Sequence, residues 1–384
     1  MRLNLSGFFR ALALVALGMQ SVISVCGQPP AISSQPQGST LIFGQFTPIS
    51  VSVTGSAPFT FQWKLNGVVV PGQTTQTVLV KLGGSYTVVV TNALGSVTSN
   101  TAIVTVANRL VNISARAQVG TGSNVEIAGF VMSGLPGSTK QVLIRAIGPG
   151  LAQFSVPGVL AQPTLTVYDS NSNVVATNTG WNTNSNAVQI AAVAANVGAF
   201  ALQPNSADSA LLLNLAPGAY TAEVSGVNGS TGVDLVEIYE VTDDSNQLVN
   251  ISTRALVGTN ANVEIAGLVI AGSQPCQVLI RADGPALSQF GVPGLLAQPS
   301  LSVVDANGTT LATNTGWSTN ANASQVATAG SLAGAFPLQS GSADCALLVT
   351  LQPGNYTAVV SGVGGTSGVA LVEVYQAPSQ VRQP

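Results

Sequence analysis

Two copies of the short motif NTGW contain the side chains best suited to contact a ligand. The first copy places Asn178 beside Trp181, and the second places Asn314 beside Trp317. A tryptophan ring stacks on the apolar face of a sugar while neighbouring amides bond to the sugar hydroxyls. The motif therefore indicates a carbohydrate-binding site in each copy. The alternative, which we favour, is that both rings cover a core beneath a loop, because large aromatic side chains are usually buried.

Several charged positions also occur twice, and the acidic pairs are Glu126 and Glu264, Asp169 and Asp305, Asp208 and Asp344, and Glu237 and Glu373. The basic pairs are Arg116 and Arg254, and Arg145 and Arg281. Two carboxyl groups across a cleft could hydrolyse a glycoside without histidine. Carboxylates on separate strands, with arginines that lower their pKa, are poor general acids. We therefore expect structural ion pairs that fix strand register, with Glu126, Glu264, Arg145 and Arg281 as their main members.

The chain has no histidine, which excludes the imidazole-dependent catalytic triads and the HExxH metalloprotease helix. The glycines mark turns and do not open a phosphate-binding loop. The turns that begin at Asp169 and Asp305 offer oxygen ligands for calcium, but Asp-x-Asn is also ordinary hairpin chemistry, which we favour. We expect no enzyme activity, no cofactor and no metal.

Residues 110–240 recur, type by type, as residues 248–376. LVNISARAQVG returns as LVNISTRALVG, and QVLIRAIGP returns as QVLIRADGP. Two residues are lost where GLPGSTK becomes GSQPC, which is typical of a loop. An active site is seldom needed twice in tandem, whereas repetition gives a binding or spacer module reach and avidity. The duplication favours a module array over an enzyme.

The composition is typical of an extracellular β protein. Of the 384 residues, 46% are hydrophobic and only 7% are charged, with 41 glycines and 20 prolines that divide the chain into short runs. The net charge of −3 provides no basic patch for phosphates, so nucleic acid is not an expected partner.

The N-terminus has the pattern of a signal peptide over residues 1–27. Arg2 and Arg10 supply positive charge, residues 11–19 are apolar, and small residues precede Gln28. A lipoprotein site at Cys26 is the alternative, although Val25 is bulky for that motif. No later run is long enough to span a bilayer. We expect a protein that is secreted or held at the cell surface.

Signal cleavage leaves Cys276 and Cys345, and both lie in the second copy. Their counterparts in the first copy are Lys140 and Ser209. The paired gain of two cysteines in an exported protein favours a disulfide between neighbouring strands. Two independent buried thiols are the alternative.

Residues 28–107 differ from the repeats and predict a small sandwich. Alternating runs at residues 49–53, 59–64, 76–80, 86–91 and 102–106 are separated by turn residues. The segments FQWKLNG and GSYTVVVTNALGS resemble the immunoglobulin-like domains of bacterial surface proteins. The resemblance implies that Trp63 is the buried tryptophan of the central strand and Tyr86 the tyrosine corner. Val88 and Val51 stand where the intersheet cysteines would be, so apolar packing must hold the sheets together.

The two copies read as all-β domains at residues 108–243 and 244–377, followed by a tail at 378–384. In the first copy, strands are expected at residues 124–132, 141–146, 164–168, 210–215, 219–226 and 234–239, and only residues 187–197 look helical. We predict sandwiches of jelly-roll type. Their closing strands weakly resemble β-sandwich domains appended to secreted bacterial hydrolases. Each copy is long enough to bury its own core, so we expect three separately folded units.

These observations predict a non-catalytic, exported bacterial protein for adhesion or spacing, with an immunoglobulin-like domain before two tandem repeats. The expected partner is an extracellular polysaccharide or a surface protein. A carbohydrate-binding accessory module that uses Trp181 and Trp317 is the alternative, and a glycoside hydrolase is the third hypothesis. The sequence leaves the oligomeric state open.

Overall fold

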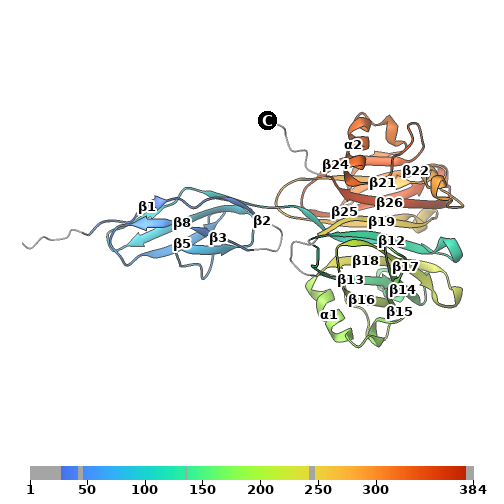
Figure 1. The fold of residues 1–384 in the computed structure, drawn as a ribbon, viewed down its shortest axis with the longest axis horizontal. Coiled ribbons are helices and arrows are strands. Elements are labelled where there is room, and N and C mark those ends of the chain that lie inside the picture. Colours follow the sequence, from blue (N-terminus) through green and yellow to red (C-terminus); the bar gives the residue numbers. More distant parts are fainter. Residues whose placement is uncertain (1–26, 42–45, 135, 242–246, 378–384) are drawn as a thin grey trace, which may run out of the picture.

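A computed structural model describes residues 27–41, 46–134, 136–241 and 247–377. The predicted signal peptide, except Gly27, and the predicted tail lie outside the described residues. The all-β fold class is confirmed, because the described elements are β-sandwiches with one α-helix in each repeat. An elongated N-terminal domain extends away from the two repeats, which lie against each other (Figure 1).

The N-terminal domain is a sandwich of short strands. They are β1 (Ala31–Ser34), β2 (Ser39–Leu41), β3 (Thr47–Ser50), β4 (Ser52–Thr54), β5 (Thr60–Leu65), β6 (Val68–Val69), β7 (Thr77–Val80), β8 (Gly84–Asn92), β9 (Gly95–Thr98) and β10 (Ala102–Val106). One sheet has the order β2-β10-β8-β5-β6, with β2 parallel to β10, and the other side carries the pairs β1-β4 and β3-β7. This is an immunoglobulin-like arrangement.

The core of this domain forms around Trp63, which is fully buried. Its indole Nε1 donates to the carbonyl of Thr75 at 2.9 Å. The hydroxyl of Tyr86 donates to the carbonyl of Leu82 at 3.0 Å, which is the geometry of a tyrosine corner. Val51 and Val88 are buried beside the tryptophan, so apolar contacts occupy the place of an intersheet disulfide.

Repeat 1 (residues 108–243) and repeat 2 (residues 244–377) have the same element order. Repeat 1 contains β11 (Arg109–Val119), β12 (Glu126–Ser133), β13 (Lys140–Ile147), β14 (Pro163–Asp169), β15 (Val174–Asn178), α1 (Ala187–Asn196), β16 (Ser209–Leu215), β17 (Gly218–Gly226) and β18 (Gly232–Glu240). Repeat 2 contains β19 (Gln247–Val257), β20 (Glu264–Ala271), β21 (Cys276–Asp283), β22 (Pro299–Asp305), β23 (Thr310–Asn314), α2 (Ala323–Ala333), β24 (Cys345–Leu351), β25 (Gly354–Gly362) and β26 (Gly368–Gln376).

The strand order within each repeat is that of a jelly roll. In repeat 1, one sheet runs β11-β18-β13-β16 and the facing sheet runs β12-β17-β14-β15. Counted from the first strand, these orders are 1-8-3-6 and 2-7-4-5. Alternating inward residues form the core, as in β12, where Ala128, Phe130 and Met132 are buried.

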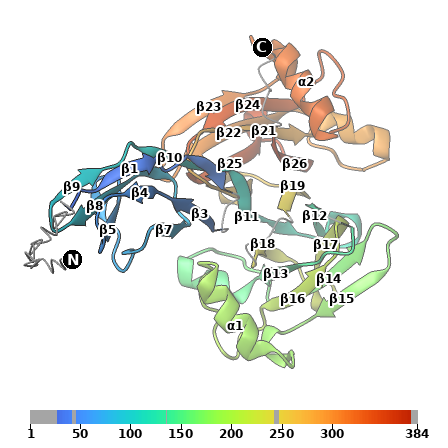
Figure 2. The same ribbon diagram turned by 60° about the vertical axis from the view of Figure 1, so that its left-hand side comes forward.

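The two repeats are joined edge to edge. Strand β11 pairs with β20 of repeat 2 along most of its length, and β19 pairs in the same way with β12 of repeat 1. We call these two pairings the seam. Each four-stranded sheet thereby continues into a sheet of the other repeat, and one apolar core contains side chains of both repeats. Figure 2 shows β11, β12 and β19 at the centre, with α1 and α2 on opposite outer sides.

The sequence predicts three separately folded units, whereas the seam joins the two repeats through their strands. Each repeat does have a complete set of eight strands, but its first strand exposes one edge that pairs with the second strand of the other repeat. The backbone donors and acceptors on such an edge need partners, and the neighbouring repeat supplies them. The two repeats therefore form one structural unit.

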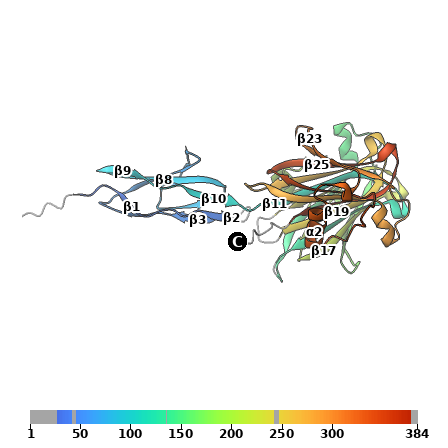
Figure 3. The ribbon, with the colours of Figure 1, turned by 90° about the horizontal axis from the view of Figure 1, so that it is seen from above.

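The N-terminal domain contacts repeat 2 through the segment that joins β10 to β11. The backbone N–H of Val106 donates to the hydroxyl of Ser273 at 2.8 Å, and the side-chain carbonyl of Asn108 accepts from the N–H groups of Ser273 and Gln274 at 3.1 Å. Ser273 and Gln274 lie in the loop that is two residues shorter than its counterpart in repeat 1. Figure 3 shows that the N-terminal domain projects from one end of the two-repeat unit.

Candidate functional site

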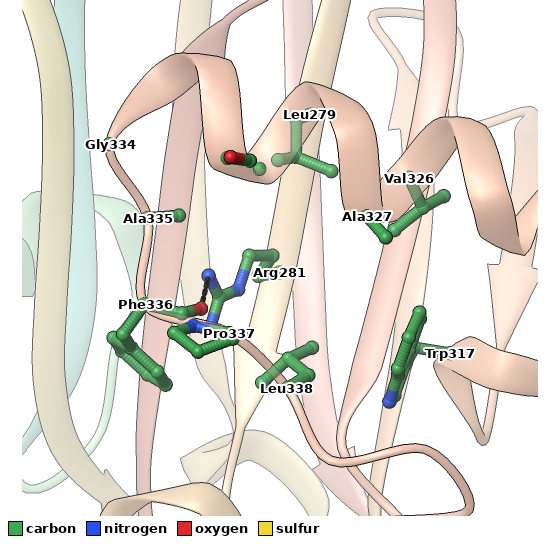
Figure 4. Close-up of a pocket in the computed structure, with 12 residues that line it drawn as sticks. Leu279, Arg281, Trp317, Val326, Ala327, Gly334, Ala335, Phe336, Pro337 and Leu338 are labelled. Atoms are coloured by element: carbon green, nitrogen blue, oxygen red, sulfur yellow. Dashed lines mark hydrogen bonds between the residues drawn. The ribbon is translucent and has the colours of Figure 1, made fainter.

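A cavity of about 310 Å³ lies beneath α2 on the outer face of repeat 2. It is partly open to solvent and is bounded by α2, by strand β21 and by the segment that follows the helix (Figure 4). Its lining residues are mainly apolar, and they are Leu279, Arg281, Trp317, Val326, Ala327, Gly330, Ser331, Gly334, Ala335, Phe336, Pro337 and Leu338. A volume of this size is at the lower end of the range for small-molecule sites.

Local sequence explains how these side chains meet. Leu279 and Arg281 are two residues apart on β21, so both point to the same outer face. Val326 and Gly330 are four residues apart on α2, which places them on the face of the helix that covers the sheet. Gly334 ends the helix at a φ of 77°, which favours glycine and turns the chain back over the cavity.

Arg281 forms the polar side of the cavity and is itself only 2% exposed. Its Nη2 lies 2.8 Å from Oδ2 of Asp283, and its Nε lies 3.2 Å from Oε2 of Glu373. Its Nη1 donates to the carbonyl of Phe336 at 2.9 Å, and the guanidinium lies 4.2 Å from the centre of the Phe336 ring. Burial alone would lower the pKa of Arg281, but Asp283 and Glu373 raise it. The positive charge is therefore balanced inside the protein.

Repeat 1 has a similar arrangement with almost no space, and Ile147 stands there in place of Asp283. Arg145 donates from Nε to Oε2 of Glu237 at 2.8 Å and from Nη1 to the carbonyl of Phe200 at 2.7 Å. The equivalent cavity has about 50 Å³ and is lined by Arg145, Trp181, Ile190, Ala191, Ala194, Ala201 and Leu202. Ile190 and Ala194 occupy the positions of Val326 and Gly330, so two of its lining side chains are each one carbon larger.

The tryptophans of the NTGW motifs cover a core, as the favoured interpretation predicts, and the asparagines are buried with them. Trp181 and Trp317 are each 8% exposed, and the indole Nε1 of each donates to a backbone carbonyl at 3.0 Å. Asn178 and Asn314 are 6% exposed, and their amides bond to the backbone around the turn. The exposed stacking platform is absent from both motifs. Trp317 contributes one wall of the cavity instead.

Several repeated acids hold turns together. Oδ1 of Asp169 accepts from the N–H groups of Asn171 and Asn173, and Asp305 makes the equivalent bonds in repeat 2, as the turn interpretation predicts. The side-chain amide of Asn173 also donates to Oδ2 of Asp169 at 2.9 Å, and this bond, together with the backbone bonds, lowers the pKa of Asp169. The backbone N–H of Thr309 is the largest cause of the lowered pKa of Asp305. Oδ1 of Asp208 accepts from two N–H groups at the loop after β13, at 2.9 and 3.0 Å.

Arg145 and Arg281 form the predicted cross-strand ion pairs, but Glu126 and Glu264 do not. Both glutamates are completely buried at the starts of β12 and β20, next to the seam. Among the described residues, no hydrogen-bond partner contacts either carboxylate. Burial raises the pKa of both groups well above the usual range, and the charges of Asp234 and Glu264 raise the pKa of Glu126 further. The recurrence of these acids together with arginines predicts ion pairs. The two glutamates instead lie on the buried faces of their strands and point into the sandwich.

Cys276 and Cys345 are both free and buried, so the predicted disulfide is wrong. Cys276 pairs in register with Leu351, and Cys345 pairs with Ala282, so the cysteines lie at opposite ends of the β21–β24 pair. Six residues of strand separate the two positions by roughly 20 Å. A disulfide cannot form across more than about 7 Å between Cα atoms.

The two cysteines replace their counterparts for separate local reasons. The thiol of Cys345 lies 3.0 Å from the carbonyl of Pro299 and 3.2 Å from that of Asn314. The hydroxyl of Ser209 donates to the equivalent two carbonyls in repeat 1, at 2.8 and 3.0 Å. Cys345 therefore occupies the place of a buried hydroxyl.

Cys276 belongs to a different exchange. Its counterpart Lys140 has its Nζ 3.4 Å from Oε2 of Glu240, and Arg109 lies 2.8 Å from the same oxygen. In repeat 2 the position of Glu240 is Gln376, so the buried cation is not needed there. The thiol and the amide are the neutral replacement for this ion cluster.

Both cysteines are expected to react as thiols when the purified chain is denatured without reductant. Burial raises the pKa of Cys345 to about 12, so the folded protein should leave that thiol unlabelled. Alkylation with iodoacetamide before and after addition of guanidinium, followed by peptide mass spectrometry, measures both states. A peptide pair that stays linked and unlabelled in denaturant would contradict the assignment.

No family model matches the chain, and no curated protein matches it. Among solved structures it is similar to a chimeric titin Z1Z2 with a decorin peptide, at 24% identity over 21% of this chain and 97% of that chain, with a TM-score of 0.19. Human titin ZIg10 is 17% identical over 25% of this chain and 92% of that chain, with a TM-score of 0.19. A titin Ig tandem is 12% identical over 64% and 95%, with a TM-score of 0.20. TM-scores this low carry no conclusion about function.

Proposed function

We propose that this chain is a non-catalytic, exported protein of a bacterial surface, with a role in adhesion or spacing. The observation that carries the proposal is the seam, which joins two jelly rolls into one unit and carries the immunoglobulin-like domain at one end. A unit of this kind holds its surfaces at fixed positions. Such rigidity suits a protein that connects or separates other structures.

The placement of the acids supports a non-catalytic role. Glu237 and Glu373 are 5% exposed and already paired with arginine, and Glu126 and Glu264 are completely buried. Neither the cavity beneath α2 nor its counterpart in repeat 1 is lined by a carboxylate. A glycoside hydrolase needs two carboxyl groups on either side of a cleft that admits the sugar. The acids described above are arranged for structure.

The proposed location rests on the sequence. Residues 1–27 have the charge and apolar pattern of a signal peptide, and the composition is that of an extracellular β protein. Within the described residues, neither helix has the length or hydropathy to cross a bilayer. We propose an extracellular polysaccharide or a surface protein as the partner.

Carbohydrate binding is the second candidate, and exposed phenylalanines favour it. Phe154 and Phe290 occupy equivalent positions and are 55% and 58% exposed. Each ring contacts a second phenylalanine edge to face, and the ring centres are 5.0 Å apart in repeat 1 and 5.2 Å apart in repeat 2. A glutamine, Gln153 or Gln289, directly precedes each exposed phenylalanine in the sequence. Exposed aromatic rings whose orientation is fixed by a neighbouring ring, with side-chain amides beside them, are suited to stacking on sugars.

Binding assays with the purified chain test both candidates. The labelled chain is expected to be retained on bacterial cells or on an insoluble polysaccharide, and to release no sugar from a panel of glycans. If sugar stacking carries retention, Phe154→Ser with Phe290→Ser should reduce it at least about tenfold. Leu311→Ser, which removes another exposed apolar side chain, is the matched control. Polysaccharide turnover that co-purifies with the chain would contradict the non-catalytic proposal.

A further inference from the structure

We propose that the cavity beneath α2 binds an uncharged small molecule, which inserts an apolar ring about the size of naphthalene. The proposal goes beyond adhesion and spacing and does not depend on either. It rests on the size and lining of the cavity, on the balanced charge of Arg281, and on the difference between the two repeats.

The size of the cavity sets the size of the ligand. Its volume of about 310 Å³ is roughly twice that of an engineered cavity of about 150 Å³ that binds benzene. Apart from Arg281 and Ser331, its lining side chains are apolar. The indole of Trp317 forms one flat wall, and Val326 and Leu338 lie near it in Figure 4. A two-ring hydrocarbon group fits this shape and leaves few polar atoms without partners.

The charge of the cavity selects against ions. Arg281 is the one charged lining residue, and Asp283, Glu373 and the Phe336 carbonyl each already contact one of its three nitrogens. An anionic ligand would compete with two internal carboxylates, and a cationic ligand would meet the guanidinium. An uncharged ligand avoids both costs, because it requires no further charge to leave water.

Comparison of the repeats shows two positions at which the helix wall of the cavity is smaller in repeat 2. The repeat 1 positions carry Ile190 and Ala194, and the cavity there has only about 50 Å³. Repeat 2 carries Val326 and Gly330, which remove one carbon each. A Cβ added at Gly330 would lie 3.8 Å from Leu279 and 3.9 Å from Ala335, which is ordinary van der Waals contact. Alanine therefore fits at this position, and glycine leaves space.

The repeats supply the test. Titration calorimetry of the full chain with 1-naphthol is expected to show one binding site. Val326→Ile with Gly330→Ala, which gives repeat 2 the residues of repeat 1, should weaken binding at least about tenfold. Ile190→Val with Ala194→Gly is the mirror variant, and its repeat 2 site should retain the wild-type Kd. A charged analogue, 1-naphthalenesulfonate, should bind at least about tenfold more weakly than 1-naphthol.

Circular dichroism and urea unfolding check the fold of each variant, and Gly330→Ala alone replaces the double variant if that one unfolds. Undetectable binding of 1-naphthol up to its solubility limit would overturn the proposal. Wild-type affinity in the folded, filled variant would place the ligand elsewhere and overturn it as well. Tighter binding of the sulfonate would overturn the assignment of an uncharged ligand.

Discussion

Replacement of Glu126 and Glu264 by glutamine should stabilise the folded chain at neutral pH by about 1–3 kcal/mol per site. Each carboxyl is completely buried and contacts no hydrogen-bond partner among the described residues. The folded state must hold it protonated, or bury an unpaired charge, while the unfolded state ionises freely. Glutamine has nearly the same shape and carries no charge, so it removes the cost that comes from ionisation, and its buried amide lacks partners just as the protonated carboxyl does.

The direction of the pH dependence follows from the raised pKa values of the two groups. A carboxyl whose pKa is higher in the folded state binds more protons folded than unfolded above its ordinary pKa. Its contribution to stability is fully present below that ordinary value and is lost as the pH rises through the folded-state pKa. The wild type should therefore gain stability from pH 8 to pH 5, and the double glutamine variant should gain less.

Urea unfolding at pH 5 and pH 8, followed by tryptophan fluorescence, measures this difference. Glu223→Gln is the matched control, because Glu223 lies on β17 with its side chain partly exposed. The control should change the stability by less than about 0.5 kcal/mol. A double glutamine variant that is less stable than the wild type at pH 8 would show that the carboxylates have partners.

Replacement of Arg145 by methionine should destabilise the chain by about 3–5 kcal/mol. Arg145 is fully buried, with its Nη2 2.7 Å from Oε2 of Glu237. Methionine fills part of the space and leaves Glu237 as an unpaired buried carboxylate. The second change Glu237→Leu should restore most of the loss, since neither member of the ion pair then leaves an unpaired buried charge.

A double-mutant cycle in urea measures the coupling between these two residues. Arg116→Met is the control, because Arg116 recurs like Arg145 but is partly exposed and donates a long bond of 3.4 Å to the Ala261 carbonyl. A loss in the Arg145 variant no larger than in the control would contradict the buried ion pair. Failure of Glu237→Leu to restore stability in the Arg145→Met background would also contradict the buried ion pair.

The sequence predicts the strands of this chain more accurately than it predicts their neighbours. Alternating residues reveal which face of a strand is buried, so residues 124–132 indicate β12 (Glu126–Ser133), and residues 187–197 indicate α1 (Ala187–Asn196). Alternation says nothing about which edges pair. The seam depends on the edges of β11 and β19, whose pattern of buried residues would be the same in separate repeats.

The candidate site could also be predicted only in part. Residue type correctly predicts the buried positions of Trp63 and Tyr86 and the ion pair of Arg145. It does not predict the cavity, which lies where α2 carries Val326 and Gly330 in place of Ile190 and Ala194. The signal was present in the alignment of the repeats, where Ile190 and Ala194 become smaller. Exposed aromatic residues were also missed, since a phenylalanine such as Phe290 looks like a core residue.

The seam also bears on how the chain originated. Its two pairings, β11 with β20 and β12 with β19, exchange places when the repeats exchange places, as the halves of a twofold dimer do. A single ancestral jelly roll with the same edges would have paired with an identical copy. Fusion after gene duplication makes that contact intramolecular and free of concentration dependence. It also allows the halves to diverge, so that an ion cluster persists in one and an open cavity in the other.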